Sequence, residues 1–241
     1  SSTSRGLGDV YKRQVLTSDH GDYLGDHWLG EKDLFHEPSV KVPLIIYDPR
    51  AESNSTRGTT CDALVESIDL APTFVEMAGG SVPDHILEGR SLTPWLRGEK
   101  PAWRDYVISE YDYSVTPQAT KLGVDSRDAR LFMVFDGRYK LMHAEGGMRP
   151  MLFDLQNDPE EFYDLAKGSD YSAEIDKLYG DLHNWGLRMS QRVTKSESDI
   201  DAMRGRSMRR GILPFMVDGS EAPEELSEKY RGPIRQDYIT D

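Results

Sequence analysis

Two residues that can bind a metal ion stand next to each other near the beginning of this chain, and a lysine follows them. Asp19 offers a carboxylate oxygen and His20 an imidazole nitrogen, a pair that suits Mn, Zn or Ca when further carboxylates complete the site. Lys32 lies beyond a glycine-containing turn and could place its ammonium group against an anionic oxygen, as transfer of a sulfuryl or phosphoryl group requires. His27 and His36 could protonate a leaving group or orient other side chains. These residue types favour metal-assisted hydrolysis of an anionic ester.

The backbone at Asp19 and His20 must leave regular strand geometry if both side chains are to reach one ion. Residues 15–18 are expected to end a buried strand, and adjacent residues of a strand point to opposite faces. Gly21 is therefore expected to allow a sharp exit from the strand. Two ligands alone do not hold a divalent ion, and no later part of the chain offers an obvious set of others. The non-functional alternatives are a capped turn with a hydrogen-bonded histidine and, for Lys32, a solvated surface lysine.

The first half of the chain predicts mixed α/β structure. Residues 42–47 are almost all apolar, as in a strand that is buried on both faces. Asp69 is a good N-cap for a helix over residues 70–78, which two glycines would end. Residues 91–96 predict another short helix.

The second half predicts a small antiparallel sheet that a helix covers. The dipeptide Asp136-Gly137 separates two β-type runs and is the strongest hairpin signal in the chain. Residues 172–193 repeat their apolar positions with helical periodicity. The predicted strands cover residues 105–111, 131–135, 138–143 and 151–155. The apolar face of the helix would consist of Ile175, Leu178, Tyr179, Leu182, Trp185 and Met189.

Composition limits the classes of function. The formal net charge is −13 over 241 residues, which argues against a general nucleic-acid binder and against a binder of anionic membranes. The single cysteine, Cys61, excludes an intrachain disulfide and matches no metal or redox spacing. No apolar run approaches the roughly 20 residues of a membrane span.

The two ends of the chain differ from the rest. Residues 1–14 are polar and aperiodic, and their second part resembles the translation of a sequencing adapter, so we expect disorder there and native protein from about Val15. A genuine disordered leader is the alternative. Residues 15–104 and 105–194 are expected to form two structural parts. Residues 195–241 form a tail that we expect to be solvated or to contact another subunit.

Several blocks resemble the second half of the catalytic domain in the sulfatase branch of the alkaline phosphatase superfamily. The first block is residues 17–49, which includes Asp19, His20 and Lys32. The later blocks are residues 69–73, 88–92, 136–140, 152–155 and 157–160. The resemblance implies an α/β fold, the C-terminal part of an alkaline-phosphatase-like mixed-sheet sandwich, with a small antiparallel sheet and its covering helix. Four further stretches look most like phosphonate monoester hydrolases and phosphodiesterases: residues 109–113, 128–133, 143–146 and the tail near residues 209–217.

The resemblance also implies roles for individual residues. Asp19 and His20 match the family's second pair of metal-site residues, Lys32 matches the lysine that contacts the sulfate or phosphate group, and His27 resembles a site-lining, catalytic residue. One divalent metal ion (Ca, Mn or Zn), a small anionic ester substrate and a formylglycine nucleophile are implied with them. The nucleophile is made from Cys or Ser in a C/S-x-P-x-R motif. Cys61 lacks the Pro and Arg of that motif, so we expect the nucleophile in a segment that precedes this chain.

These implications set expectations for the chain as a whole. It is expected to be a fragment of a longer enzyme, inactive by itself and poorly soluble because an apolar strand edge is exposed. The phosphonate hydrolase interpretation favours a cytoplasmic location and a homo-oligomer formed through the tail. An aryl- or alkylsulfatase is the alternative among enzymes, and a non-catalytic remnant that only mediates assembly is the alternative outside them.

Overall fold

The structure is a computed structural model that describes residues 13–188, 196, 198, 199 and 202. Its contacts divide the chain into two units, residues 1–193 and 194–241, and all labelled helices and strands belong to the first unit. The predictions made for residues 1–12 and for most of the tail lie outside the described residues. Among the helices of the described residues, none combines the length and the apolar character needed to cross a membrane.

The first two strands form an antiparallel ribbon. β1 (Gln14–Thr17) pairs with β2 (Leu44–Tyr47), and Leu16 lies opposite Ile45. Both of these side chains are 60% exposed, whereas Val15, Leu44 and Ile46 on the other face are half-buried. The expectation that residues 42–47 are buried on both faces is therefore wrong for the described chain, because within it β2 has only β1 as a partner.

Asp69 does not cap the helix that follows it, contrary to the prediction. The 3-10 turn η4 (Ser67–Asp69) continues directly into α2 (Leu70–Met77), so the Asp69 backbone is itself helical and its side chain turns away from the first amide groups of α2. Its buried carboxylate instead accepts hydrogen bonds from the backbone N–H of Glu66 and of Arg90 and from the guanidinium of Arg104. Asp69 thus joins several segments at one point.

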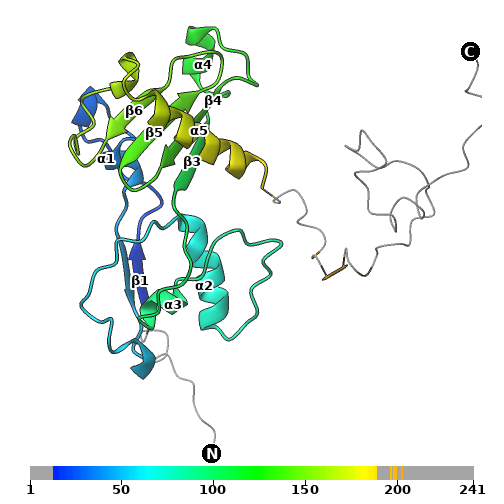
Figure 1. The fold of residues 1–241 in the computed structure, drawn as a ribbon. Coiled ribbons are helices and arrows are strands. Elements are labelled where there is room, and N and C mark those ends of the chain that lie inside the picture. Colours follow the sequence, from blue (N-terminus) through cyan, green and yellow to red (C-terminus); the bar gives the residue numbers. More distant parts are fainter. Residues whose placement is uncertain (1–12, 189–195, 197, 200–201, 203–241) are drawn as a thin grey trace, which may run out of the picture. The chain divides into compact units, whose positions relative to one another are not determined.

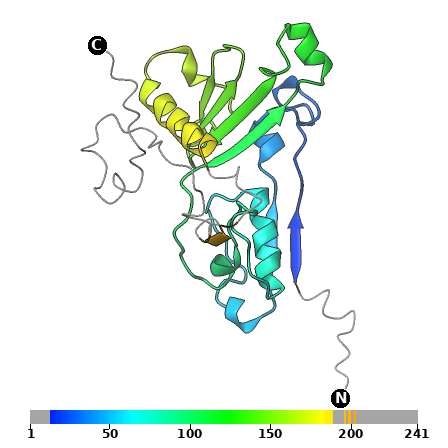
Figure 2. The ribbon, with the colours of Figure 1, turned by 90° about the vertical axis from the view of Figure 1, so that its right-hand side faces the viewer.

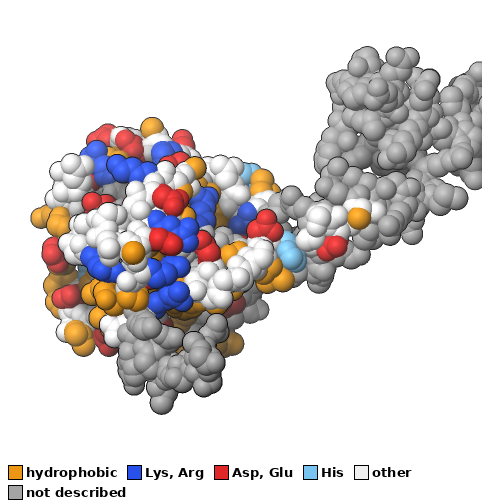
Figure 3. Space-filling model, turned by 90° about the horizontal axis from the view of Figure 1, so that it is seen from below, with side chains coloured by type: hydrophobic (Ala, Val, Ile, Leu, Met, Phe, Trp, Pro, Cys, Tyr) orange, Lys and Arg blue, Asp and Glu red, His pale blue; other side chains and the backbone are white. Residues whose placement is uncertain are grey.

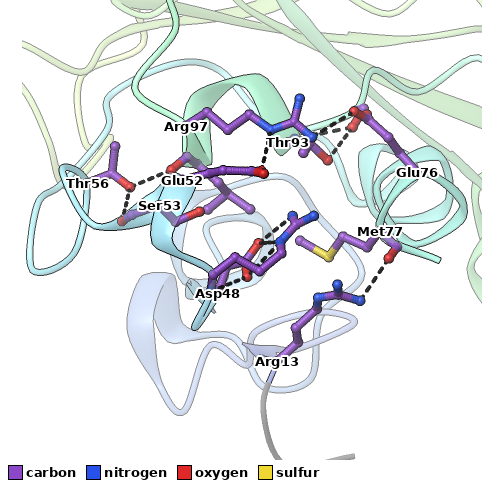
Figure 4. A network of polar contacts seen from close by, with 12 residues as sticks. Arg13, Asp48, Glu52, Ser53, Thr56, Glu76, Met77, Thr93 and Arg97 are labelled. Atoms are coloured by element: carbon purple, nitrogen blue, oxygen red, sulfur yellow. Dashed lines mark hydrogen bonds and ion pairs between the residues drawn. The ribbon is translucent and has the colours of Figure 1, made fainter. Parts of the chain in front are cut away.

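A second polar network connects the loop after β2 to two helices (Figure 4). Asp48 is buried, and Arg50 donates to its Oδ2 from Nε at 2.8 Å. Arg97 follows α3 (Thr93–Leu96) and forms ion pairs with Glu52 in η3 (Ala51–Ser53) and with Glu76 in α2. These contacts hold the irregular connection between β2 and α2 in place.

The predicted antiparallel sheet is present, with its strands in sequence order. The turn at Asp136 and Gly137 is confirmed: Gly137 has φ +94°, and the Asp136 carboxylate accepts the backbone N–H of Tyr139. The strands are β3 (Val107–Asp112), β4 (Arg130–Phe135), β5 (Tyr139–Ala144) and β6 (Met151–Asp154).

The two faces of this sheet carry different partners. Helix α5 (Ser172–Gly186) lies across one face, where Leu178 packs on Val134, Leu141 and Leu152 (Figures 1 and 2). The helix ends at Gly186 and not at residue 193 as predicted. Phe35 and Val40, from the segment between β1 and β2, pack on the opposite face. The sheet therefore supports the loop that carries the predicted site. The buried sheet residues of that face are Met133, Met142 and Phe153.

Some short elements were not predicted. They are α1 (Glu37–Val40), α4 (Pro117–Leu122), η2 (Asp26–Trp28) and η5 (Leu165–Lys167). The two α-helices carry a proline in their first turn, where its missing N–H costs no hydrogen bond. On the face seen in Figure 3, acidic, basic and apolar side chains are interspersed.

Candidate active-site loop

Asp19 and His20 leave the end of β1 with their side chains close together. Asp19 Oδ2 lies 3.5 Å from His20 Nε2, and the Asp19 side chain is 85% exposed, so both groups open to solvent. The strand has ended at Thr17, which is the condition under which adjacent residues can share one ligand. The pKa of Asp19 is lowered, first by a backbone hydrogen bond and then by the neighbouring imidazole.

The ammonium group of Lys32 contacts the same histidine. His20 Nδ1 lies 2.6 Å from the carbonyl oxygen of Gly21, and a carbonyl oxygen only accepts, so Nδ1 carries the proton. His20 Nε2 is therefore left with a lone pair, and it accepts from Lys32 Nζ at 2.7 Å. A carboxylate, an imidazole lone pair and an ammonium group thus meet at one exposed point.

The chain between His20 and Lys32 folds back on itself. The backbone N–H of Tyr23 donates to the oxygen of Glu31 at 3.0 Å, and that of Gly25 donates to the oxygen of Leu29 at 2.9 Å. This loop stores backbone strain, because non-glycine residues occupy the left-handed region at a cost of about 1–3 kcal/mol each. They are Leu24, His27, Trp28 and Glu31.

Gly21 is required for a reason other than the predicted one. Its φ is not positive, so the residue does not exploit the special torsional freedom of glycine. A Cβ atom at this position would instead lie 1.9 Å from the carbonyl oxygen of Pro38. The Gly21 N–H donates to the oxygen of Ser39 at 2.7 Å, so α1 is pressed directly against the residue after His20.

His27 lies in an aromatic cluster beside this group. Its ring stacks on His36 at 4.1 Å and contacts Phe162 at 5.1 Å. The Tyr23 hydroxyl lies 2.8 Å from His36 Nδ1. Burial, together with the charges of His27 and Lys140, lowers the pKa of His36 to about 4, so His36 is neutral at pH 7. The described contacts place His27 on this cluster and not on Lys32, and its catalytic role stays a prediction.

Comparison with known proteins identifies the family. The family described as N-sulphoglucosamine sulphohydrolase, C-terminal, matches residues 25–186, which include Lys32 and His27. The chain belongs to the sulfatase family. It is thereby a member of the alkaline phosphatase superfamily and of a family of hydrolases, which confirms the resemblance seen in the sequence.

Three relatives show how far this likeness extends. The multifunctional alkaline phosphatase superfamily protein PehA of Trinickia caryophylli is 35% identical over 74% of the chain and 35% of its own length. An arylsulfatase of Clostridium perfringens is 31% identical over 68% of the chain and 31% of its own length. The crystal structure of the phosphonate monoester hydrolase of Agrobacterium radiobacter superposes with a TM-score of 0.66 at 32% identity, over 73% of the chain and 35% of that structure. The chain spans about a third of the length of these relatives.

The sulfatase family implies a divalent metal ion, and Asp19 and His20 fit part of a site for one. Their oxygen and nitrogen donors are of the kinds that Ca, Mn or Zn accepts, and they lie side by side. Within residues 13–188 and the few others described, no three or more His, Cys, Asp and Glu side chains cluster so that they could hold a metal ion. The described residues therefore bring together two candidate ligands, Asp19 and His20, and no larger group of such side chains.

Several residues that shape this loop escaped sequence reasoning. Ser39 is buried, and its Oγ donates to the backbone oxygen of Lys32 at 2.6 Å. Lys140 and Glu161 form a buried ion pair that contacts Glu37 in α1. A lysine within the β-type run of residues 138–143 is the one signal that could have pointed to this pair.

Proposed function

We propose that this sulfatase chain carries part of the active site of a hydrolase that acts on phosphonate monoesters or phosphate diesters. The observation that carries the proposal is the meeting of Asp19, His20 and Lys32 at the exposed end of β1. The likeness to a phosphonate monoester hydrolase at 32% identity supports this substrate class. A sulfate ester is the second candidate, and the 31% identity to an arylsulfatase favours it.

Each of the three side chains has a distinct task in this proposal. Asp19 and His20 would hold a divalent metal ion, which polarises the reacting group and stabilises the negative charge that develops on it. The Gly21 carbonyl fixes the proton of His20 on Nδ1, so the Nε2 lone pair, which accepts from Lys32 in the described structure, would be the donor to a metal ion. Lys32 would bind an anionic oxygen of the ester. Its ammonium group is exposed and within reach of the same point.

The nucleophile belongs to another part of the protein in this proposal. Cys61 is exposed, and its neighbours Thr60 and Asp62 do not form the formylglycine motif. We infer that a formylglycine and further metal ligands come from sequence that precedes the present chain. The 241-residue chain alone would then hydrolyse no ester.

The test uses a longer protein, expressed from the source DNA with the coding sequence extended upstream of the present chain. The rates at which this protein hydrolyses a phenylphosphonate monoester, a phosphate diester and an aryl sulfate would be measured. We expect kcat/KM to be highest on the phosphonate monoester, and Lys32→Met to lower it roughly 100-fold or more, as loss of one preorganised charge does in active sites. Lys121→Met, at an exposed helix position, is the matched control and should leave kcat/KM unchanged.

Two results would contradict the proposal. A higher kcat/KM on the aryl sulfate than on the phosphonate monoester would favour the second candidate, a sulfate ester hydrolase. Full activity of Lys32→Met on all three esters would show that Lys32 does not bind the anionic oxygen of the ester.

A further inference from the structure

One buried residue, Ser39, hydrogen-bonds to the backbone on both sides of the His20–Lys32 contact. The backbone oxygen of Ser39 accepts the N–H of Gly21, the residue after His20, at 2.7 Å. The Ser39 hydroxyl donates to the backbone oxygen of Lys32 at 2.6 Å. Ser39 therefore fixes the two backbone segments from which the contacting side chains emerge.

Ser39 belongs to α1, a single helical turn too short to be stable by itself. The first residue of this turn is held from outside. The backbone N–H of Glu37 donates to Glu161 Oε2 at 2.6 Å, and Glu37 Oε1 accepts from Lys140 Nζ at 2.7 Å. Lys140 Nζ also lies 2.8 Å from Glu161 Oε1. Lys140 therefore forms ion pairs with both Glu37 and Glu161, and the hydrogen bond from the Glu37 backbone N–H to Glu161 closes the arrangement.

The two residues that hold α1 in place, Lys140 and Glu161, belong to the antiparallel sheet or follow it directly. Lys140 is 1% exposed and lies in β5, and Glu161 is 2% exposed and follows β6. Burial of Glu161 raises its pKa against the effect of Lys140, and its φ of +56° lies in the left-handed region. The burial of the Glu161 carboxylate and its left-handed backbone both cost free energy. Such unfavourable features persist where the surrounding structure holds the residue in place.

We propose that Lys140 and Glu161 are positioning residues for the Asp19, His20 and Lys32 group, and that they act through Glu37 and Ser39. The inference rests on the proposed function for the catalytic use of this group, but the coupling itself is a property of the described residues. In this proposal Lys140 and Glu161 do not contact His20 or Lys32 directly. They fix the position of α1, and α1 fixes the position of the loop that carries His20 and Lys32.

The coupling can be measured without substrate or metal. In the 241-residue chain at pH 8, the ring-nitrogen chemical shifts of His20 report the Nδ1–H tautomer and the Lys32 contact at Nε2. Hydrogen exchange of the Gly21 amide reports its bond to Ser39. The His20 signals do not change when a substitution merely lowers the unfolding temperature. The Gly21 exchange rate is therefore compared with the rates of amides in β4 and β5, which a general loss of stability also speeds. A purely structural role would leave the His20 signals and this relative rate as in the wild type.

Three substitutions separate the steps. Ser39→Ala should shift the His20 Nε2 signal, because Lys32 loses its backbone anchor, while Gly21 exchange stays slow. The double variant Lys140→Met, Glu161→Gln removes the buried charges together, and should both shift the His20 signal and speed Gly21 exchange roughly tenfold or more. Ser53→Ala is the matched control for the serine, since Ser53 is buried and its hydroxyl has no partner in the described chain. Arg138→Met, which breaks the Arg138–Asp154 pair of the same sheet, is the control for the charges.

The outcomes are decisive in both directions. Wild-type signals at His20 and Gly21 in a folded double variant would overturn the coupling to the sheet. A wild-type His20 signal in Ser39→Ala, which disturbs no buried charge and should fold, would overturn the coupling through Ser39. If the extended protein hydrolyses none of the three esters while these signals change as expected, the proposed function fails and the positioning role stands.

Discussion

At the scale of single residues, His36 makes the stability of the chain depend on pH. It is buried between the Tyr23 hydroxyl and the His27 ring, and its pKa falls from 6.5 to about 4 because burial and the charges of His27 and Lys140 disfavour its protonated form. The unfolded chain therefore takes up a proton at a higher pH than the folded chain. The stability that neutral His36 contributes is complete above about pH 6.5 and is lost as the pH falls from 6.5 to 4.

The expected size follows from the two pKa values. Urea unfolding of the 241-residue chain should give a free energy about 2 kcal/mol lower at pH 5 than at pH 7.5 from this group alone. His36→Gln keeps a polar side chain of similar size and should flatten that difference. His85→Gln, at a half-buried loop position, is the control and should preserve it. An equal pH dependence in His36→Gln and in the wild type would show that other groups cause it.

At the scale of elements, the Asp69 and Arg104 pair joins η4, α2 and the segment before β3. Both side chains are buried, and Asp69 also accepts two backbone N–H groups, from Glu66 and Arg90. Asp69→Ala would leave a buried guanidinium and two buried donors without this acceptor. We expect the free energy of unfolding to fall by about 3–5 kcal/mol, as it does when one partner of a buried pair is removed.

A surface pair provides the comparison for Asp69. Arg130 and Glu145 lie 3.5 Å apart on the same chain, with both side chains more than a third exposed. Glu145→Ala should change the free energy of unfolding by less than about 1 kcal/mol. Chemical denaturation of both variants measures the contrast, and equal losses would show that burial does not set the value of the Asp69 pair.

Elements that are specified by neighbouring residues in the sequence were predictable, and elements that depend on contacts with distant residues were not. Asp136-Gly137 specifies its own turn, and the helical periodicity from residue 172 identifies α5, although not its end. Asp69 has the residue type of an N-cap, but the preceding 3-10 turn leaves its carboxylate to other partners. α1 has four residues, too few for a periodic pattern, and depends on Lys140 far along the chain.

The same distinction applies to the candidate site. The residue types and spacing of Asp19, His20 and Lys32 indicated one loop with shared chemistry, and the structure brings the three side chains together. The spacing alone did not indicate how the loop reverses, because left-handed residues such as Leu24 and Trp28 are held by their surroundings and not by their own preference. The need for glycine at position 21 likewise arises from Pro38, which no local pattern reveals.

At the scale of the whole molecule, the ribbon of β1 and β2 leaves apolar surface open to solvent. Leu16 and Ile45 lie opposite each other and are both 60% exposed, with Tyr47 on the same face. β2 borders an open groove of about 2060 Å³, whose lining includes Leu44, Ile45, Ile46 and Tyr47. A two-stranded ribbon with one apolar exposed face offers other chains both hydrophobic area and unpaired strand edges.

We therefore predict that the 241-residue chain associates with itself and that this face drives the association. The double variant Leu16→Lys, Ile45→Lys should weaken self-association by roughly tenfold or more per residue, since burying a leucine or isoleucine side chain contributes about 1.5–3 kcal/mol. Leu122→Lys, at a position 61% exposed in α4, is the matched control and should associate like the wild type. Sedimentation velocity over a range of concentrations measures all three. A monomeric wild-type chain at every concentration would refute the prediction, and equal association of the double variant and the wild type would place the contact on another surface.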